Sequence, residues 1–388
     1  MTELSWAQVS ARRLQRHRLC PPAEPVSDAA PDVGRLADVV SVMCGAHAQI
    51  ASAAELSVGL RVPGATRALV RRALWTDRTL VKTRGPRGTV HLLAAADLPM
   101  WVGALSALPA PPWERSVVLL TPRQTEQVFA AIADAVAEAD LTTAELTEEI
   151  VARTGPWAGD LVMEAFQDKW PRWVAAMTAA TRGGVICFGP NRGRATTYTS
   201  PARWLPDFAP MPGRAALAAL VRSYLYAYGP ATPAQFARWL GVAPPWATGL
   251  FESVDLTEVT VEGTRAWVPV DDAEFPDDEP SGLRLLPYFD AYAVGCHPRE
   301  QLFPGAAAER ALAGGQAGNY PVLLIDGVVA GVWHQRRSGR TIQVTVEPLW
   351  ALDPGRQRQL AEEVERVGQI LEGHATLTIG RVSVGPHA

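Results

Sequence analysis

The 388-residue sequence predicts an α+β fold that consists of three similar modules and a β-rich C-terminal domain. Two observations support this prediction. A pattern of two helices and a β-hairpin recurs three times before residue 271, and the remaining residues contain short runs of β-branched and apolar residues. Because 48% of the residues are hydrophobic and 20% are charged, the composition is that of a folded protein. No apolar run reaches the length of about 18 residues that a membrane-spanning helix needs.

The first module ends in a predicted hairpin. Residues 70–75 have the apolar spacing of the end of an amphipathic helix. Two apolar runs follow at residues 79–83 and 89–93, and the residues between them, 84–88, contain the glycine and proline that are typical of a turn.

The second module has the same order of elements. A short helix opens at Leu141 with Thr142 or Thr143 as its N-cap, because a hydroxyl side chain can accept a hydrogen bond from the first turn. We predict a longer helix over residues 163–180 and a hairpin over residues 185–199.

The third module carries the strongest helix signals. Thr232 is the predicted N-cap, Pro233 occupies the first helical position and Gly241 ends the helix, which is the asymmetry that helices favour. A second helix over residues 246–251 and a hairpin over residues 256–268 complete the module. Two helices and a hairpin, repeated in this way, are the pattern of winged-helix modules in tandem.

The C-terminal region begins with an acidic linker, residues 271–281. A helix is predicted over residues 354–371, and strands are predicted over residues 283–287, 322–326, 328–334, 341–346 and 375–384. Asp326-Gly327 favours a tight hairpin turn. Because consecutive hairpins leave exposed edges unless the sheet closes, we expect a β-barrel-like domain. The predicted domains are residues 1–112, 113–208, 209–275 and 276–388.

The net charge of −4 hides an uneven distribution of charge. Eight basic residues and one acidic residue lie between positions 61 and 87, and four arginines without an acid lie between positions 182 and 203. Arg12, Arg13, Arg16 and Arg18 form a third cluster. Such clusters indicate either contact with nucleic-acid phosphates or solvated helix faces.

Metal ions, cofactors and disulfides are not expected. Cys20, Cys44, Cys187 and Cys296 stand singly, without a Cys-x-x-Cys pair, and the sequence has neither a P-loop nor a dinucleotide-binding glycine motif. Residues 1–14 lack the apolar core of a signal peptide. These features favour a reduced, cytoplasmic setting.

Four segments, in this order, resemble the winged-helix DNA glycosylases of the AlkZ and YcaQ type. They are Gly45-Ala-His-Ala-Gln49 with the helix that follows, Arg87-Gly-Thr-Val-His-Leu92, Leu285-Leu-Pro-Tyr-Phe-Asp-Ala-Tyr292 and Asp326-Gly-Val-Val-Ala-Gly-Val-Trp333. The resemblance covers residues 4–384. It implies three tandem winged-helix domains and a C-terminal β-barrel, arranged in a C shape around DNA.

The catalytic motif of that family is two polar residues flanking an apolar one, commonly Gln-x-Gln or Gln-x-Asp. The resemblance therefore assigns the catalytic roles to His47 and Gln49, with Asp290 either supporting the site or holding a turn. The histidine departs from the common pattern. A His-x-Gln motif resembles family members associated with resistance to bulky intercalating antibiotics that alkylate guanine.

These residues suit the hydrolysis of an N7-alkylated guanine. Such a base is already cationic, so its glycosidic bond breaks without a strong general acid, and the enzyme must chiefly position the attacking water. Gln49 can orient that water, and His47 can hydrogen-bond it. Because the ordinary pKa of histidine is about 6.5, His47 could also accept a proton from the water. As an alternative, His47 could cap the helix that begins near Ser52. No lysine is near the motif in sequence to form a Schiff base, so we expect a monofunctional glycosylase without lyase activity.

Double-stranded DNA with alkylated guanine is the expected partner. Nine basic residues are candidates for contact with it: Arg61, Lys82, Arg84, Arg87, Arg192, Arg194, Arg336, Arg337 and Arg340. We expect a monomer in the bacterial cytoplasm, associated with the nucleoid when bound to DNA.

Two other functions fit parts of the sequence. A non-catalytic transcriptional regulator would also use winged helices, although a regulator typically dimerises to read two half-sites. A resistance protein that sequesters a drug would not need the clustered arginines. Substitution of Gln49 by alanine distinguishes these alternatives, because only an enzyme would lose base release while still binding DNA.

Overall fold

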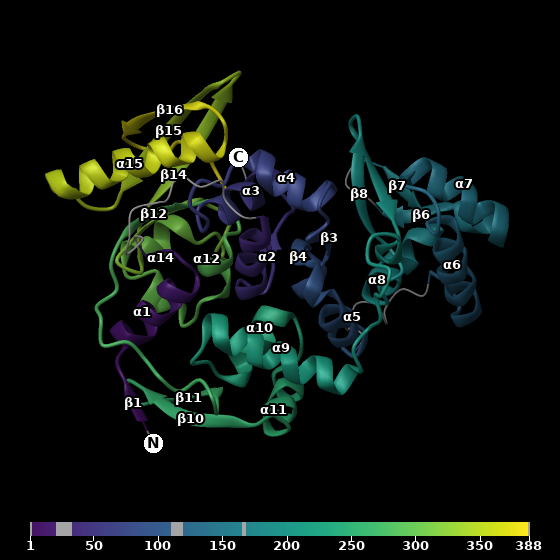
Figure 1. Ribbon diagram of the computed structural model, residues 1–388, viewed down its shortest axis with the longest axis horizontal. Helices are drawn as coiled ribbons and strands as arrows, with labels where there is room; N and C mark the ends of the chain where they lie inside the picture. The colour runs from purple at the N-terminus through teal and green to yellow at the C-terminus, as the bar shows by residue number, and fades with distance from the viewer. Residues whose placement is uncertain (1, 21–32, 110–118, 165–167, 387–388) are drawn as a thin grey trace. The chain divides into compact units, whose positions relative to one another are not determined.

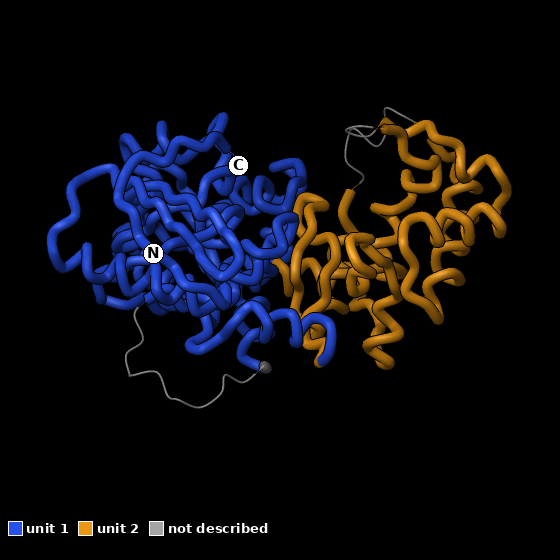
Figure 2. The backbone as a smooth tube through the Cα atoms, turned by 90° about the horizontal axis from the view of Figure 1, so that it is seen from above, with its two compact units in different colours: residues 1–76, 221–388 blue, residues 77–220 orange. Residues whose placement is uncertain are grey.

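The computed structural model describes residues 2–20, 33–109, 119–164 and 168–386. The chain forms two compact units (Figure 2). The first contains residues 1–76 and 221–388, and the second contains residues 77–220. The predicted boundary between residues 112 and 113 lies outside the described residues, and the other predicted domain boundaries stay predictions. Among the described residues, no helix is both long and apolar enough to cross a membrane.

The first unit contains two sheets and most of the helices (Figure 1). Its N-terminal part comprises β1 (Thr2–Leu4), α1 (Trp6–Arg16), α2 (Val33–Val42), β2 (Ala46–His47), α3 (Ala51–Gly59) and α4 (Arg67–Trp75). After α9 (Gly213–Tyr228), which begins in the second unit, come α10 (Pro233–Leu240), α11 (Pro244–Glu252), β10 (Leu256–Val261), β11 (Thr264–Pro269), β12 (Leu283–Leu286), α12 (Ala291–Gly295), α13 (Arg299–Leu302), α14 (Ala306–Ala311), β13 (Val322–Ile325), β14 (Val328–Ser338), β15 (Thr341–Pro348), α15 (Pro354–Ile370) and β16 (His374–Ile379).

The third predicted module is confirmed element by element. The Thr232 side chain accepts a hydrogen bond from the backbone of Gln235, Pro233 begins α10, and Gly241 follows in a left-handed conformation with φ 85°. The hairpin β10–β11 follows α11 as predicted. The sequence did not indicate that β1 adds to this hairpin as a parallel strand, which makes a three-stranded sheet in the order β1-β10-β11.

The arginines of α1 hold the first unit together. Arg12 and Arg16 form ion pairs with Asp272 at 2.7 and 2.5 Å, and the guanidinium of Arg13 donates to the backbone oxygens of Gly229, Pro230 and His297. Arg12 and Arg13 are buried. The charges of Arg12, Arg13 and Arg16 are therefore used inside the fold rather than on a phosphate-binding surface, whereas Arg18, the fourth member of the cluster, is exposed.

The C-terminal domain is a curled five-stranded sheet in the order β12-β13-β14-β15-β16. Neighbouring strands run antiparallel except β15 and β16, which are parallel and connected by α15. Among the described strands no ladder joins β12 to β16, so the closure expected from the sequence is not present. Instead α15 packs against β12, and its buried Glu363 accepts a hydrogen bond from the backbone nitrogen of Leu285 at 3.2 Å. The edge is thus covered by a helix.

The second unit contains the other two predicted hairpins. Its helices and strands are β3 (Leu80–Arg84), β4 (Val90–Ala94), α5 (Leu98–Ser106), α6 (Pro122–Ala135), β5 (Leu141–Thr142), α7 (Thr143–Thr154), β6 (Leu161–Glu164), β7 (Lys169–Pro171), α8 (Met177–Arg182), β8 (Cys187–Arg192) and β9 (Ala195–Thr199). Strands β3 and β4 form the first hairpin, and β5, β9 and β8 form a three-stranded sheet. Thr142 is the N-cap of α7, as predicted.

The predicted helix over residues 163–180 is wrong. The described residues of this segment, 163–164 and 168–180, contain parts of strands β6 and β7, a 3-10 turn over residues 172–176 and, as their only α-helix, the start of the short α8. Pro171 explains the difference, since proline lacks the backbone donor and its ring clashes with the preceding helical turn. The apolar spacing nevertheless marks the core, because Trp173 is completely buried and donates a hydrogen bond to the Thr147 hydroxyl at 3.0 Å.

Candidate functional site

His47, Ala48 and Gln49 lie on a tight connection between α2 and α3. The end of α2 is closed by hydrogen bonds from the backbone nitrogens of Cys44 and Gly45 to the oxygens of Ser41 and Val40, both at 2.9 Å. Cys44 and Gly45 have left-handed φ values of 53° and 94°, and Cys44 is therefore strained. This turn places the motif directly before the first turn of α3.

The two polar residues of the motif differ in exposure. His47 is buried, with 9% of its surface accessible, whereas Gln49 is exposed. The residue at the N-cap of α3 is Ile50, which makes no side-chain capping bond. The alternative interpretation of His47 as the cap of this helix is therefore wrong. An exposed carboxamide beside a mostly shielded imidazole is an arrangement that a substrate can reach from the Gln49 side.

The ring of Phe289 packs on the imidazole of His47. The ring centroids are 4.5 Å apart and the planes are inclined by 31°. Phe289 lies on the connection between β12 and α12, has a left-handed φ of 55°, and donates a backbone hydrogen bond to Gly318 at 3.0 Å. Sequence reasoning did not single out Phe289, although the Tyr-Phe-Asp segment that contains it was one of the recognised motifs.

Asp290, the next residue, is the centre of a buried hydrogen-bond network. Arg61 binds its two carboxylate oxygens at 2.8 and 2.9 Å, the Ser57 hydroxyl donates to it at 2.6 Å, and the backbone nitrogen of Tyr292 donates at 3.0 Å. Burial acts to raise the pKa of Asp290, but the charge of Arg61 and these hydrogen bonds outweigh burial and lower the pKa below its ordinary value. Asp290 thus holds a turn and connects it to α3.

The prediction that Arg61 contacts DNA is wrong for this structure. Both side chains of the Arg61–Asp290 pair are completely inaccessible to solvent. A phosphate could reach the guanidinium only if the pair separated, which would leave Asp290 buried without its counter-ion.

The candidate DNA contacts of the second unit differ in accessibility. Arg87 is exposed on the turn of the first hairpin, and Arg84 is half-buried and donates to the backbone oxygen of Gly88 at 2.9 Å. The Lys82 ammonium lies 5.1 Å from the centre of the Phe188 ring. Arg194 is exposed, as is Arg192, which forms an ion pair with Glu145 at 2.6 Å.

The hairpin of β14 and β15 carries the other three candidates of the first unit, besides Arg61. Arg336, Arg337 and Arg340 are all exposed near its turn. Arg337 donates to the backbone oxygens of Gly339 and Leu371, at 2.9 and 2.7 Å, and so braces the end of α15. Arg336 and Arg340 are the better candidates for direct contact with a phosphate.

The cysteines and the acidic residues do not form a metal site within the described residues. The four cysteines are thiols rather than disulfides, and burial raises the pKa of the Cys296 thiol to about 11.

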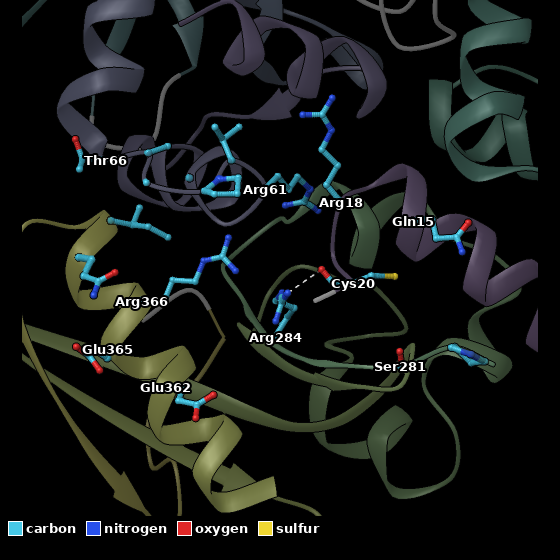
Figure 3. Close-up of a pocket in the computed structure, with 18 of the residues that line it drawn as sticks. Gln15, Arg18, Cys20, Arg61, Thr66, Ser281, Arg284, Glu362, Glu365 and Arg366 are labelled. Carbon is cyan, nitrogen blue, oxygen red and sulfur yellow. Dashed lines mark hydrogen bonds between the residues drawn. The ribbon is translucent and has the colours of Figure 1, made fainter. Parts of the chain in front are cut away.

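A cavity of about 1100 Å³ lies at the opposite end of α3 from the motif (Figure 3). Arg284 and Arg366 line it together with Glu362 and Glu365. Neither His47 nor Gln49 is among the described residues that line it. Because the cavity carries charges of both signs and none of the motif residues, we do not place the candidate active site there.

Comparison with known proteins identifies the family of the chain. The model of the AlkZ-like DNA glycosylase family matches residues 40–370. An interstrand DNA cross-link repair glycosylase of Streptomyces sahachiroi is 33% identical over 342 residues, which is 85% of this chain and 87% of that protein. The solved structure of Streptomyces sahachiroi DNA glycosylase AlkZ is similar with a TM-score of 0.78 and 29% identity, covering 98% of this chain and 100% of that chain. The chain therefore belongs to the AlkZ-like family of DNA glycosylases, which are enzymes that act on N-glycosyl bonds.

Proposed function

We propose that this chain is a monofunctional DNA glycosylase that hydrolyses the N-glycosidic bond of N7-alkylguanine in double-stranded DNA. Its proposed substrates include bulky adducts of intercalating antibiotics and the interstrand cross-links that such agents form. The observation that carries the proposal is the His47-Ala48-Gln49 turn before α3, in a chain similar to a glycosylase named for interstrand cross-link repair.

The proposed reaction transfers no group to the protein. The bond between the sugar carbon C1′ and the base nitrogen N9 breaks, and its electron pair stays with the base and neutralises the charge of the alkylated ring. A water oxygen then bonds to C1′, and a proton leaves that water. Because the leaving group is already activated, the protein chiefly positions the water and tolerates the developing positive charge on the sugar.

Gln49 and His47 share these tasks. The exposed carboxamide of Gln49 can accept a hydrogen bond from the attacking water and so fix its direction. The imidazole of His47 can hydrogen-bond the same water or the adduct, and its second nitrogen can accept the released proton. Asp290 supports the site through the turn that it caps.

A lyase step is not part of the proposal. Schiff-base formation needs an amine nucleophile, and the sequence contains two lysines, Lys82 and Lys169. Lys82 of strand β3 lies against the ring of Phe188, and Lys169 forms an ion pair with Glu164 at 3.5 Å. We expect an abasic site as the product, without incision of the strand.

The finer features of DNA binding are part of the same proposal. The helix–helix–hairpin modules act as three winged-helix domains, and the chain acts as a monomer in the bacterial cytoplasm. The basic residues that contact DNA phosphates are Arg84, Arg87, Arg194, Arg336 and Arg340. Lys82 and Arg192, which also interact with Phe188 and Glu145, contribute to the same contact. The hairpins of both units present most of these side chains at their turns.

Substitution of the motif residues tests the proposal. Gln49→Ala and His47→Ala are compared with the wild type and with Gln369→Ala, which removes an exposed glutamine of α15. We expect both motif variants to bind adduct-containing duplex DNA like the wild type and to release base about 100-fold more slowly or worse. Full base release by Gln49→Ala would show that the motif is not the catalytic site.

A further inference from the structure

Phe289 combines three features that are unusual for a residue of the hydrophobic core. It is half-buried, its backbone has a left-handed φ of 55°, and its ring lies on the imidazole of His47 with centroids 4.5 Å apart. A bulky side chain in the left-handed region is strained, and a strained conformation persists only where the surroundings impose it.

The surroundings of Phe289 do impose its conformation. Asp290 is bound by Ser57, which belongs to α3, and by Arg61, which follows the end of this helix. On the other side, the Phe289 backbone nitrogen donates to the oxygen of Gly318. Gly318 has a φ of 95°, and a Cβ atom there would approach the Phe289 Cα at 3.1 Å, so only glycine fits this close approach.

The same helix that follows the catalytic motif therefore also holds the residue that packs on it. His47 precedes α3 by four residues, and Ser57 lies in its last turn. A rigid helix thus fixes the distance between the motif and the network around Asp290. The consequence of this connection is a defined plane for the imidazole ring.

We propose that Phe289 is a positioning residue that sets the orientation of the His47 imidazole, and that Ser57, Arg61 and Asp290 hold Phe289 in place. The proposal rests on the function proposed above and adds a residue that acts through His47. Phe289 contacts neither water nor substrate in this role. Its ring restricts the rotation of the imidazole, so that one ring nitrogen faces the reacting water.

The experiment compares Phe289→Leu, which removes the flat ring, with Phe289→Tyr, which retains it. Phe275→Leu is the matched control, because Phe275 is a half-buried phenylalanine of the same unit that packs on the sheet of β1, β10 and β11. Three quantities are measured for each variant. They are the single-turnover rate and the DNA dissociation constant with N7-alkylguanine duplex, and the NMR signals of the His47 ring. The His47 signals are assigned by their loss in His47→Gln.

We expect Phe289→Leu to lower the single-turnover rate about 10- to 100-fold with a dissociation constant changed less than about threefold, and Phe289→Tyr to restore the rate. The His47 ring protons should move downfield in Phe289→Leu alone, because the ring current of Phe289 is lost. A rate and a His47 spectrum for Phe289→Leu equal to those of Phe275→Leu would overturn the inference. If the wild type released no base, the proposed function would fail, and the His47 spectrum would still decide whether Phe289 holds the ring.

Discussion

Arg61 and Asp290 form an ion pair that is completely removed from solvent. Asp290→Asn should therefore lower the free energy of unfolding by about 3–5 kcal/mol, because it leaves the Arg61 charge buried without its counter-ion. Urea denaturation followed by tryptophan fluorescence measures this change. The matched control is Asp326→Asn, since Asp326 pairs with Arg356 at a partly exposed position, where about 0–1 kcal/mol is expected. Equal losses for the two variants would contradict the structural role of Asp290.

His17 is the second buried polar centre of the first unit. Its imidazole faces the Ala227 oxygen at 3.2 Å and packs on Tyr228 and Tyr292. Burial, together with the nearby charge of Arg61, lowers the pKa of His17 from 6.5 to about 3. Between these two values the unfolded chain binds a proton that the folded chain does not, so the folded state loses stability as the pH falls.

His17→Gln separates this effect from other acid-sensitive groups. Wild-type stability relative to the variant should be constant above pH 6.5 and should then decrease, by at most about 1.4 kcal/mol per pH unit, as the pH falls toward 3. Denaturant unfolding of both proteins at pH 7.5, 6, 5 and 4 measures the difference. A difference that stays constant over this range would mean that His17 titrates normally in the folded protein.

The sequence was informative about the proposed catalytic motif and much less informative about the contacts that hold it. His47 and Gln49 are recognisable because they lie within three residues of each other. The resemblance also pointed to Asp290, but local sequence showed neither the packing of Phe289 on His47 nor the pairing of Asp290 with Arg61, 229 residues away. Arg61 was misassigned for the same reason: local sequence shows its basic neighbours, but it does not show the distant carboxylate that buries it.

At the scale of elements, the β14–β15 hairpin presents the exposed arginines Arg336 and Arg340 near its turn. The double variant Arg336→Ala/Arg340→Ala should weaken DNA binding uniformly across sequences and reduce the slope of log affinity against log salt by about 1–2. Fluorescence anisotropy over a series of salt concentrations measures both quantities. The control is Arg358→Ala on the exposed face of α15. An unchanged slope in the double variant would exclude the hairpin from DNA contact.

Arg337 should behave differently from its two neighbours. Its guanidinium donates to the Leu371 oxygen, so it satisfies a carbonyl at the end of α15. We expect Arg337→Ala to lower the free energy of unfolding by about 1–2 kcal/mol, which is below the centre of the range for hydrogen bonds of charged groups because the Arg337 side chain is exposed. Chemical denaturation measures this loss. A variant with wild-type stability and weaker DNA binding would instead assign Arg337 to the DNA surface.

Elements with strong local signals were predictable, and those fixed by distant contacts were not. The prediction of α10 was correct because Thr232, Pro233 and Gly241 act locally. The parallel additions of β1 and β16 depend on pairing across long stretches of chain, which leaves no local pattern. The false helix over residues 163–180 arose because apolar spacing was weighted above Pro171.

At the scale of the whole molecule, the fold agrees with that of an AlkZ-like DNA glycosylase, as the TM-score of 0.78 indicates. The number of winged-helix domains and their arrangement around DNA stay predictions. The second unit shows why sequence repeats and compact units differ. It begins at Asp77 with the hairpin of the first module, while the helices of that module belong to the first unit. Function must therefore be tested on the complete chain.

The central claim is base release without strand incision. The direct measurement is incubation of the purified chain with duplex DNA that carries either N7-methylguanine or a bulky intercalating N7 adduct, followed by quantification of free modified base and of strand breaks before and after alkali. The account predicts free base from the wild type, breaks only after alkali, and neither from Gln49→Ala. Tight DNA binding without release of either base would contradict it and would favour a non-catalytic DNA-binding protein.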